Sequence, residues 1–421
     1  MTIHHPQPSS GGVTLSRACL VCGTAFEPFM SFGRQPIANA FLEPDRFDSE
    51  FFYELKVGAC PSCRMVQLAQ HVDPGLMFHE QYAFFSGTSK GMTAHFAQLA
   101  ATLREAYLDG PDPFVVEIGS NDGILLQNFL DPPVRHLGIE PSKNVADVAA
   151  AKGIRTVSRF FDSDLASDIA TADGQADVIA AANVMCHIPD LHSVIAGVRA
   201  LLKPNGVMVF EDPYLGDIVA KVSYDQIYDE HAFYFSVTSL SRLFAMHGME
   251  IVDVAAQDVH GGSMRYTVRH QGAGPISPRV AAQLLREREL GLDRDGTFID
   301  LRRRIEASRD ELVALLRRAR GEGKRVVGYG ATSKSTTVTN YCGITSDLVE
   351  FVSDTTPIKQ GKFTPGSHIP VRSYAEFEAR PPDYALLFAW NHAREILAKE
   401  RRFVDGGGRF IVYVPQVGIL S

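Results

Sequence analysis

The chain has 421 residues, of which 45% are hydrophobic and 21% are charged, so it is long enough to bury the cores of two or three domains. Its net charge of −8 argues against a broad surface for nucleic acid or for an anionic membrane. No apolar run reaches the roughly 18 residues that a spanning helix needs. We therefore expect neither nucleic acid nor a membrane as a partner.

The N-terminal stretch is polar and contains glycine, serine and histidine. It lacks the basic start and the apolar centre of a secretory signal peptide. We predict a disordered leader over residues 1–15 and a cytoplasmic protein.

Four of the six cysteines form two Cys-x-x-Cys pairs, Cys19 with Cys22 and Cys60 with Cys63. Two such pairs in a chain without a secretion signal are typical of four thiolates around one zinc ion. The alternatives are two disulfides, which a reducing cytosol disfavours, and four buried thiols, which the paired spacing disfavours. Four Cys ligands leave no open coordination position, so we expect a structural zinc. The strand-forming residues around the pairs indicate a small β domain over residues 16–80, too short to be stable without its metal.

A helix is predicted over residues 93–108, because apolar side chains recur on one of its faces. Tyr82 precedes this helix in a polar, glycine-containing context. It is either a core residue or a lid tyrosine over a neighbouring site.

A buried strand, a glycine-containing turn and a helix follow at residues 113–129, and a second strand ends at Glu140. This layout holds an adenosine, with the acid accepting hydrogen bonds from the ribose hydroxyls. The middle glycine of the dinucleotide pattern is replaced by Asn121, so NAD is not the expected cofactor. The candidate cofactor-binding residues are Glu117, Gly119, Asn121, Asp122, Glu140 and Asn183.

Further strands, predicted at residues 153–157, 176–184 and 207–212, alternate with helices. This alternation indicates an α/β fold with a parallel, doubly wound sheet. A ligand of such a sheet binds beyond the carboxyl ends of the strands, where Asn183 and His187 fall.

The stretch 228–236 follows the last of these strands and can reach the same edge. It places Tyr228, Glu230 and His231 next to an aromatic run. One interpretation is a surface helix end with core aromatics. The other is a proton-transfer site, because buried charges need partners and a His or Glu beside a Tyr hydroxyl can act as a general base.

A glycine- and proline-rich boundary near residue 275 precedes a second α/β unit, and we predict domains over residues 16–80, 81–275 and 276–421. In the last domain, a strand leads into a turn of Gly, Ser, Thr and Lys and then into a helix. Such a helix start suits a diphosphate, although an ordinary helix cap is the alternative. His260 lies in a loop, where a substrate contact and a plain loop role are both open. The candidate substrate-binding residues are Ser333, Lys334, Ser335, Thr336 and His260.

The chain resembles the S-adenosylmethionine-dependent C-methyltransferases of deoxysugar biosynthesis in five stretches, at residues 117–123, 183–187, 203–206, 228–231 and 234–236. The likeness is closest to enzymes that methylate C-3′ of dTDP-linked 4-keto deoxysugars, and it covers nearly the whole chain. It implies a zinc-binding N-terminal domain, a Rossmann-like methyltransferase domain and a C-terminal domain that helps to hold the nucleotide sugar.

The resemblance implies C-3′ methylation of a dTDP-sugar in antibiotic biosynthesis, by a chain that we expect to be a monomer. We expect His231 to take the C-3′ proton, Glu230 to orient or replace it, and Tyr228 to donate to the enolate; His187 and Tyr82 are implied pocket residues. Two alternatives stay open. One is an O- or N-methyltransferase of a nucleotide sugar, which needs no carbon-acid base. The other is a non-enzymatic zinc-ribbon module, which the acidic balance disfavours.

Overall fold

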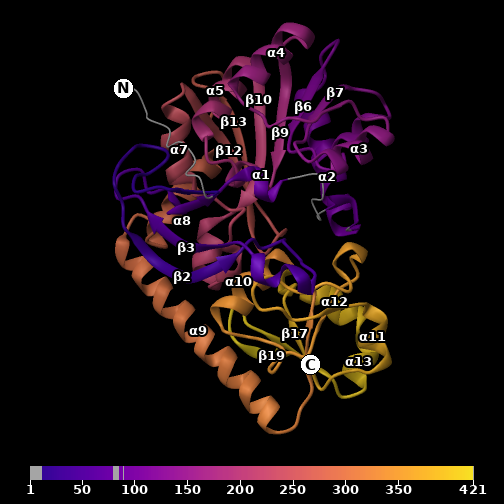
Figure 1. Ribbon diagram of the computed structural model, residues 1–421. Helices are drawn as coiled ribbons and strands as arrows, with labels where there is room; N and C mark the ends of the chain where they lie inside the picture. Colours follow the sequence, from indigo (N-terminus) through magenta and orange to yellow (C-terminus); the bar gives the residue numbers. More distant parts are fainter. Residues whose placement is uncertain (1–11, 79–84, 89, 421) are drawn as a thin grey trace.

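The computed structural model describes residues 12–78, 85–88 and 90–420 (Figure 1). Residues 1–11 of the predicted leader and Tyr82 lie outside the described residues. Residues 13–15 of the predicted leader belong to the fold, because β1 (Val13–Leu15) pairs with β5 (Gln70–Val72). Among the described residues, no helix combines the length and the apolar composition needed to cross a bilayer.

A seven-stranded sheet forms the centre of the molecule. From one edge to the other, its strands are β12 (Met249–Gln257), β13 (Ser263–His270), β10 (Leu202–Pro213), β9 (Ala176–Ala182), β6 (Phe114–Ile118), β7 (Arg135–Ile139) and β8 (Thr156–Val157). Strands β10, β9, β6, β7 and β8 are parallel, whereas β13 runs antiparallel to both of its neighbours. The predicted parallel, doubly wound sheet is therefore confirmed, with an antiparallel pair at one edge.

Helices cover both faces of this sheet. They are α2 (Lys90–Tyr107), α3 (Lys143–Ala151), α4 (Ser163–Asp173), α5 (Leu191–Leu201), α7 (Val237–Ala245) and α8 (Pro278–Glu289). Successive strand residues point to opposite faces. Accordingly, Val116 of β6 joins the core with α4, α5, α7 and α8, whereas Val115 joins the core with α2 and α3. Burial on both faces explains why three consecutive residues of this strand, Phe114 to Val116, are apolar.

The N-terminal sheet contains a strand from the central part of the chain. Its order is β11 (Phe233–Tyr234), β4 (Val66–Leu68), β3 (Phe52–Ala59) and β2 (Pro28–Pro36). Strand β11 comes directly after residues 228–232, which include Tyr228, Glu230 and His231 and are called the catalytic stretch below, and Phe233 pairs with Gln67. The metal-binding region and the catalytic stretch therefore share one sheet.

The C-terminal sheet has six strands, all parallel except for the last pair. They are β16 (Val371–Arg372), β15 (Val352–Ser353), β14 (Val326–Tyr329), β17 (Tyr384–Leu387), β18 (Arg409–Val412) and β19 (Gly418–Leu420). The helices of this unit are α9 (Asp295–Gly321), α10 (Ser333–Tyr341), α11 (Tyr374–Ala379), α12 (Ala393–Lys399) and α13 (Arg401–Asp405). Leu55 of β3 and Val338 of α10 belong to one hydrophobic core. Figure 1 accordingly shows the indigo strands β2 and β3 between the other two sheets.

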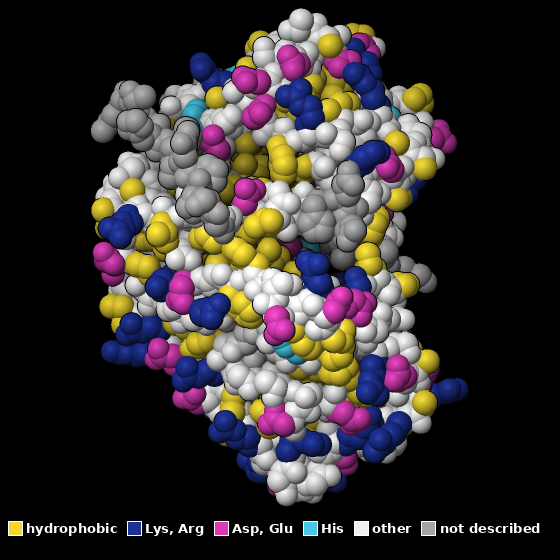
Figure 2. Space-filling model, viewed as in Figure 1, with side chains coloured by type: hydrophobic (Ala, Val, Ile, Leu, Met, Phe, Trp, Pro, Cys, Tyr) yellow, Lys and Arg dark blue, Asp and Glu magenta, His cyan; other side chains and the backbone are white. Residues whose placement is uncertain are grey.

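Short helical segments connect these elements. They are η1 (Pro44–Ser49), α1 (Pro74–Met77), η2 (Ser86–Thr88), η3 (Leu126–Phe129), η4 (Met185–His187), α6 (Leu215–Lys221), η5 (Tyr224–Gln226), η6 (Pro357–Lys359) and η7 (Trp390–His392). Basic and acidic side chains are interspersed on the face drawn in Figure 2, in keeping with the modest net charge.

The prediction of a strand at residues 153–157 is wrong for residues 153–155. Gly153 has φ of 87°, and the N–H of Ile154 donates to the Ala149 carbonyl. A left-handed glycine with such a bond is a helix C-cap. These two residues therefore end α3, and the strand begins only at Thr156.

Candidate active site and zinc centre

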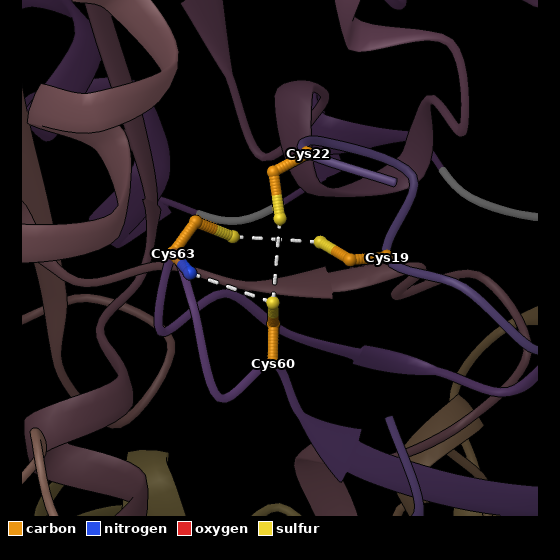
Figure 3. A group of neighbouring side chains, drawn as sticks. All are labelled: Cys19, Cys22, Cys60 and Cys63. Atoms are coloured by element: carbon orange, nitrogen blue, oxygen red, sulfur yellow. Dashed lines mark hydrogen bonds between the residues drawn. The ribbon is translucent and has the colours of Figure 1, made fainter. Parts of the chain in front are cut away.

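The four paired cysteines converge on one point (Figure 3). The sulfurs of Cys19 and Cys63 are 3.4 Å apart, as are those of Cys22 and Cys60, and all four cysteines are free thiols. Tetrahedral zinc with Zn–S bonds of about 2.3 Å places its sulfurs about 3.8 Å apart. The spacing fits one zinc ion and is far too long for disulfides.

Each Cys-x-x-Cys pair lies on a tight turn that points its sulfurs inward. The N–H of Gly23 donates to the Cys19 carbonyl, and Gly23 has φ of 72°. The N–H of Val21 donates to Cys19 Sγ, and the N–H of Cys63 donates to Cys60 Sγ, each at 3.4 Å. Donors aimed at sulfur stabilise thiolates, which are the zinc-binding form.

The predicted adenosine edge is built around Glu140. Its carboxylate accepts from the backbone N–H of Asn121 at 3.0 Å and from that of Ser142 at 2.8 Å. Gly119 has φ of 68°, and a Cβ there would lie 2.2 Å from the side chain of Val184. The turn therefore requires glycine, and the acid is held at the strand end where ribose hydroxyls bind in such folds.

Two buried acceptors at this edge have no hydrogen-bond partner among the described residues. They are Oε2 of Glu117, whose side chain is 2% exposed, and Oδ1 of Asn183. Burial, with Glu140 and Asp122 adding to it, raises the pKa of Glu117 well above its usual value. Unpartnered buried polar atoms are costly, so these two atoms fit a bound cofactor that forms hydrogen bonds with them. Glu117, Glu140 and Asn183 would hold S-adenosylmethionine.

The carboxylate of Asp122 forms hydrogen bonds within the protein. It accepts from the N–H of Gly87 at 3.2 Å and from Lys152 Nζ at 3.3 Å. Asp122 therefore ties the segment before α2 to the glycine-containing turn.

Replacing Glu140 with Ala should weaken the binding of S-adenosylhomocysteine about tenfold, because a charged hydrogen-bond acceptor is lost. The affinity for dTDP should not change, since Glu140 lies at the edge of the central sheet. Isothermal titration calorimetry measures both constants, and Asp147→Ala on the exposed side of α3 is the control. An unchanged cofactor affinity in Glu140→Ala would place the adenosine elsewhere.

His231 is buried between two oxygen partners. Its Nδ1 lies 2.7 Å from the Gln226 carbonyl, and its Nε2 lies 3.0 Å from the Tyr228 hydroxyl. A carbonyl only accepts, so Nδ1 carries the proton and the Tyr228 hydroxyl donates to Nε2. Burial, reinforced by His187, lowers the pKa of His231 well below its usual value. The imidazole is therefore neutral, with its lone pair on Nε2.

His187 lies beside this pair, at the end of η4. Its ring centroid is 5.2 Å from that of His231, and its buried Nε2 has no partner among the described residues. Burial lowers the pKa of His187 to about 4. The structure thus brings His187, Tyr228 and His231 together, as the sequence predicts.

Glu230 is 4% exposed, and its Oε1 accepts from Asn39 Nδ2 at 2.6 Å. The two residues are 191 positions apart. Sequence reasoning missed Asn39, and no motif or spacing could have linked it to Glu230.

The carboxyl edges of the central and C-terminal sheets meet at Lys334. The start of β13 pairs with the end of β10, so the loop that carries His260 lies at the carboxyl edge of the central sheet. Lys334, at the start of α10, donates from Nζ to the His260 carbonyl at 3.2 Å. Burial lowers the pKa of Lys334, and Asp225 opposes that change. His260 Nε2 is buried without a partner among the described residues, and burial lowers the pKa of His260 to about 3.

The hydroxyls of the predicted diphosphate turn already have protein partners. Ser335 Oγ donates to the Thr332 carbonyl, and Thr336 Oγ1 donates to the Ala38 carbonyl at 2.9 Å. Both side chains are buried, whereas Ser333 and Lys334 are partly exposed. The N–H of Ser335 donates to Thr332 Oγ1 at 3.2 Å, which is an ordinary helix cap, so a ligand at this helix start has the side chains of Ser333 and Lys334 within its reach.

Trp390 and Lys359 complete this edge, and the sequence did not point to either. Trp390 Nε1 donates to the buried carboxylate of Asp225 at 2.6 Å, and Lys334 Nζ lies 5.5 Å from the Trp390 ring centroid. Lys359 donates to the Ala331 carbonyl at 2.8 Å, and burial lowers its pKa, a change that Asp354 and Glu230 oppose. Two lysines from the C-terminal unit therefore lie beside the catalytic stretch.

Known families match three parts of the chain: a zinc binding domain at residues 19–78, a methyltransferase domain at 92–254 and a C-methyltransferase C-terminal domain at 258–415. The C-methyltransferase NovU of Streptomyces niveus is 36% identical over 406 residues, which cover 96% of each chain. A ubiquinone biosynthesis O-methyltransferase of Vibrio parahaemolyticus is 28% identical over 98 residues, 23% of this chain and 42% of that one. Among solved structures, an S-adenosylmethionine-dependent methyltransferase of Anabaena variabilis aligns with a TM-score of 0.34 at 19% identity, covering 41% of this chain and 84% of that one.

Proposed function

The chain belongs to the C-methyltransferase family that includes NovU, with a zinc-binding domain and an S-adenosylmethionine-dependent methyltransferase domain, and from this premise we propose its substrate and mechanism. The proposed reaction transfers a methyl group to C-3′ of a dTDP-linked 4-keto deoxysugar in antibiotic biosynthesis. The observation that carries the proposal is the buried, neutral His231–Tyr228 pair, which lies beside His187.

A carbon beside a ketone loses its proton readily, because the resulting negative charge spreads onto the oxygen. His231 Nε2 is the base in this mechanism, since it carries a lone pair at neutral pH. When Nε2 takes the proton, the Tyr228 hydroxyl no longer has an acceptor there and donates to the enolate oxygen instead. Glu230, next along the chain, orients this pair. S-adenosylmethionine, when bound, supplies the electrophilic methyl group.

The charges around α10 support a sugar nucleotide as the substrate. Lys334 and Lys359 are cations on the side of the catalytic stretch that faces the C-terminal unit. The backbone N–H groups at the start of α10 carry the positive end of the helix dipole. A diphosphate beside Lys334 would place the sugar toward Tyr228 and His231, with His260 and His187 at its sides.

The direct test is product analysis. The enzyme, incubated with a dTDP-4-keto-6-deoxyhexose and S-adenosylmethionine carrying a ¹³C methyl group, should yield a sugar whose new methyl group is bonded to C-3′ in two-dimensional NMR spectra. C-5′ also neighbours the ketone, and a methyl group there would move the site of attack while retaining the enolate. A methyl group on oxygen or nitrogen would refute the proposed mechanism.

A further inference from the structure

A segment of the zinc-binding domain reaches the catalytic stretch. The N–H of Ala38, just beyond β2, donates to Asp229 Oδ1 at 3.0 Å. The next residue, Asn39, donates from its side-chain amide to Glu230 Oε1 at 2.6 Å. Two consecutive residues of the first domain therefore bind two consecutive acids of the catalytic stretch.

The same segment is held from its other side by the C-terminal unit. Thr336 of α10 donates from Oγ1 to the Ala38 carbonyl at 2.9 Å, and Ala38 itself is buried. The N–H of Phe41 closes a turn onto the Asn39 carbonyl at 2.9 Å. Since both polar backbone groups of Ala38 are bonded, the adjacent Asn39 has little freedom to move its amide.

The catalytic stretch is also anchored at its far end by this domain. The N–H of Leu68 in β4 donates to the Ala232 carbonyl at 2.9 Å. Beyond it, Tyr234 of β11 pairs with Val66 of β4. The zinc-binding domain thus holds backbone or side-chain groups on both sides of His231.

We infer that Asn39 is a positioning residue: its amide fixes the carboxylate of Glu230, the neighbour of His231 in the chain, so that the zinc-binding domain helps to place the catalytic groups. The inference rests on the proposed function, because it takes Glu230 to act through His231. Glu230 is 4% exposed, and a hydrogen bond of 2.6 Å to a carboxyl group buried to this degree restricts where that group can lie.

The test is a double-mutant cycle of Asn39→Ala and Glu230→Gln, with kcat measured for methyl transfer. Asn39→Ala alone should lower kcat about 10- to 100-fold, the worth of one hydrogen bond to a charged group, with little change in KM. In the Glu230→Gln background, the same change should cost no more than about threefold. Ala40→Ser, at the exposed next position, is the control and should retain wild-type kcat.

Equal losses from Asn39→Ala in both backgrounds would overturn the inference, because Asn39 would then act without Glu230. Asn39→Asp keeps the shape of the side chain but places a second carboxylate next to Glu230, so it should lose more activity than Asn39→Ala. If the Ala variant unfolds, Asn39→Asp provides the test instead. Calorimetry with S-adenosylhomocysteine shows that each variant is folded. Failure of the proposed function is seen separately, as a wild-type enzyme that does not methylate carbon.

Discussion

Replacing His231 with Asn should lower kcat by about 10²- to 10⁴-fold, the usual cost of removing a general base. Asn can still donate to the Gln226 carbonyl, but it offers no basic lone pair to the substrate. The affinities for S-adenosylhomocysteine and dTDP should survive, because a base acts mainly in the transition state. Steady-state kinetics measures kcat, and calorimetry measures the two affinities. The control is His136→Asn, because His136 lies near the start of β7, at the opposite edge of the sheet.

Isotope exchange locates the proton that His231 removes. In D₂O, the wild-type enzyme should wash deuterium into C-3′ of the 4-keto sugar, and His231→Asn should do so far more slowly. Deuterium at C-5′ instead would identify the other acidic carbon. A variant that methylates at the wild-type rate would remove His231 from the base role. If the wild-type enzyme is active without exchange, a primary isotope effect with C-3′-deuterated substrate shows whether that bond breaks during turnover.

The lowered pKa of His231 also predicts how the activity depends on pH. Because the pKa is lowered, the ring stays neutral as the pH falls from 8 toward the ordinary histidine value of 6.5. A base that is already deprotonated loses no activity over that range. The kcat/KM profile should therefore show no histidine-like fall between these two pH values, whereas an unperturbed histidine base would produce one.

Replacing Lys334 with Ala should raise the KM for the sugar nucleotide about 10- to 100-fold and change kcat far less, because a charge that binds the diphosphate contributes equally before and during the reaction. Lys334 is partly exposed at the start of α10, where a phosphate can approach it. Initial rates at saturating S-adenosylmethionine separate the two constants. Lys324→Ala is the matched control, since Lys324 is an exposed lysine of the same unit that pairs with Asp383.

The fluorescence of Trp390 provides a second way to measure how Lys334→Ala affects the binding of dTDP. Trp390 is the single tryptophan of the chain, and Lys334 Nζ lies 5.5 Å from its ring. Adding dTDP should change the tryptophan fluorescence of the wild-type protein, and the titration midpoint should move to higher concentration in Lys334→Ala. A large fall in kcat at an unchanged KM would instead assign Lys334 to the chemical step.

Local patterns were sufficient for the zinc-binding cysteines and the fold class, and they predict where an adenosine would bind. Cys19 and Cys22 lie on one turn, and thiolates in such pairs have few uses other than holding a metal. Glu140 follows a strand at a spacing that the strand–turn–helix–strand unit determines by itself. These signals are readable because each depends on residues that are close in sequence or on a regular alternation of elements.

Tertiary structure alone decided how the three units share one site. Asn39 reaches Glu230 across 191 residues, and Asp225 holds Trp390 across 165. Strand β11 leaves the catalytic stretch to join the zinc-binding sheet. Such contacts depend on how separate cores pack together, and a single hydrogen bond between distant segments leaves neither a period nor a spacing in the chain. The sequence therefore predicts the candidate catalytic groups, whereas the packing of the zinc-binding domain decides what holds them in place.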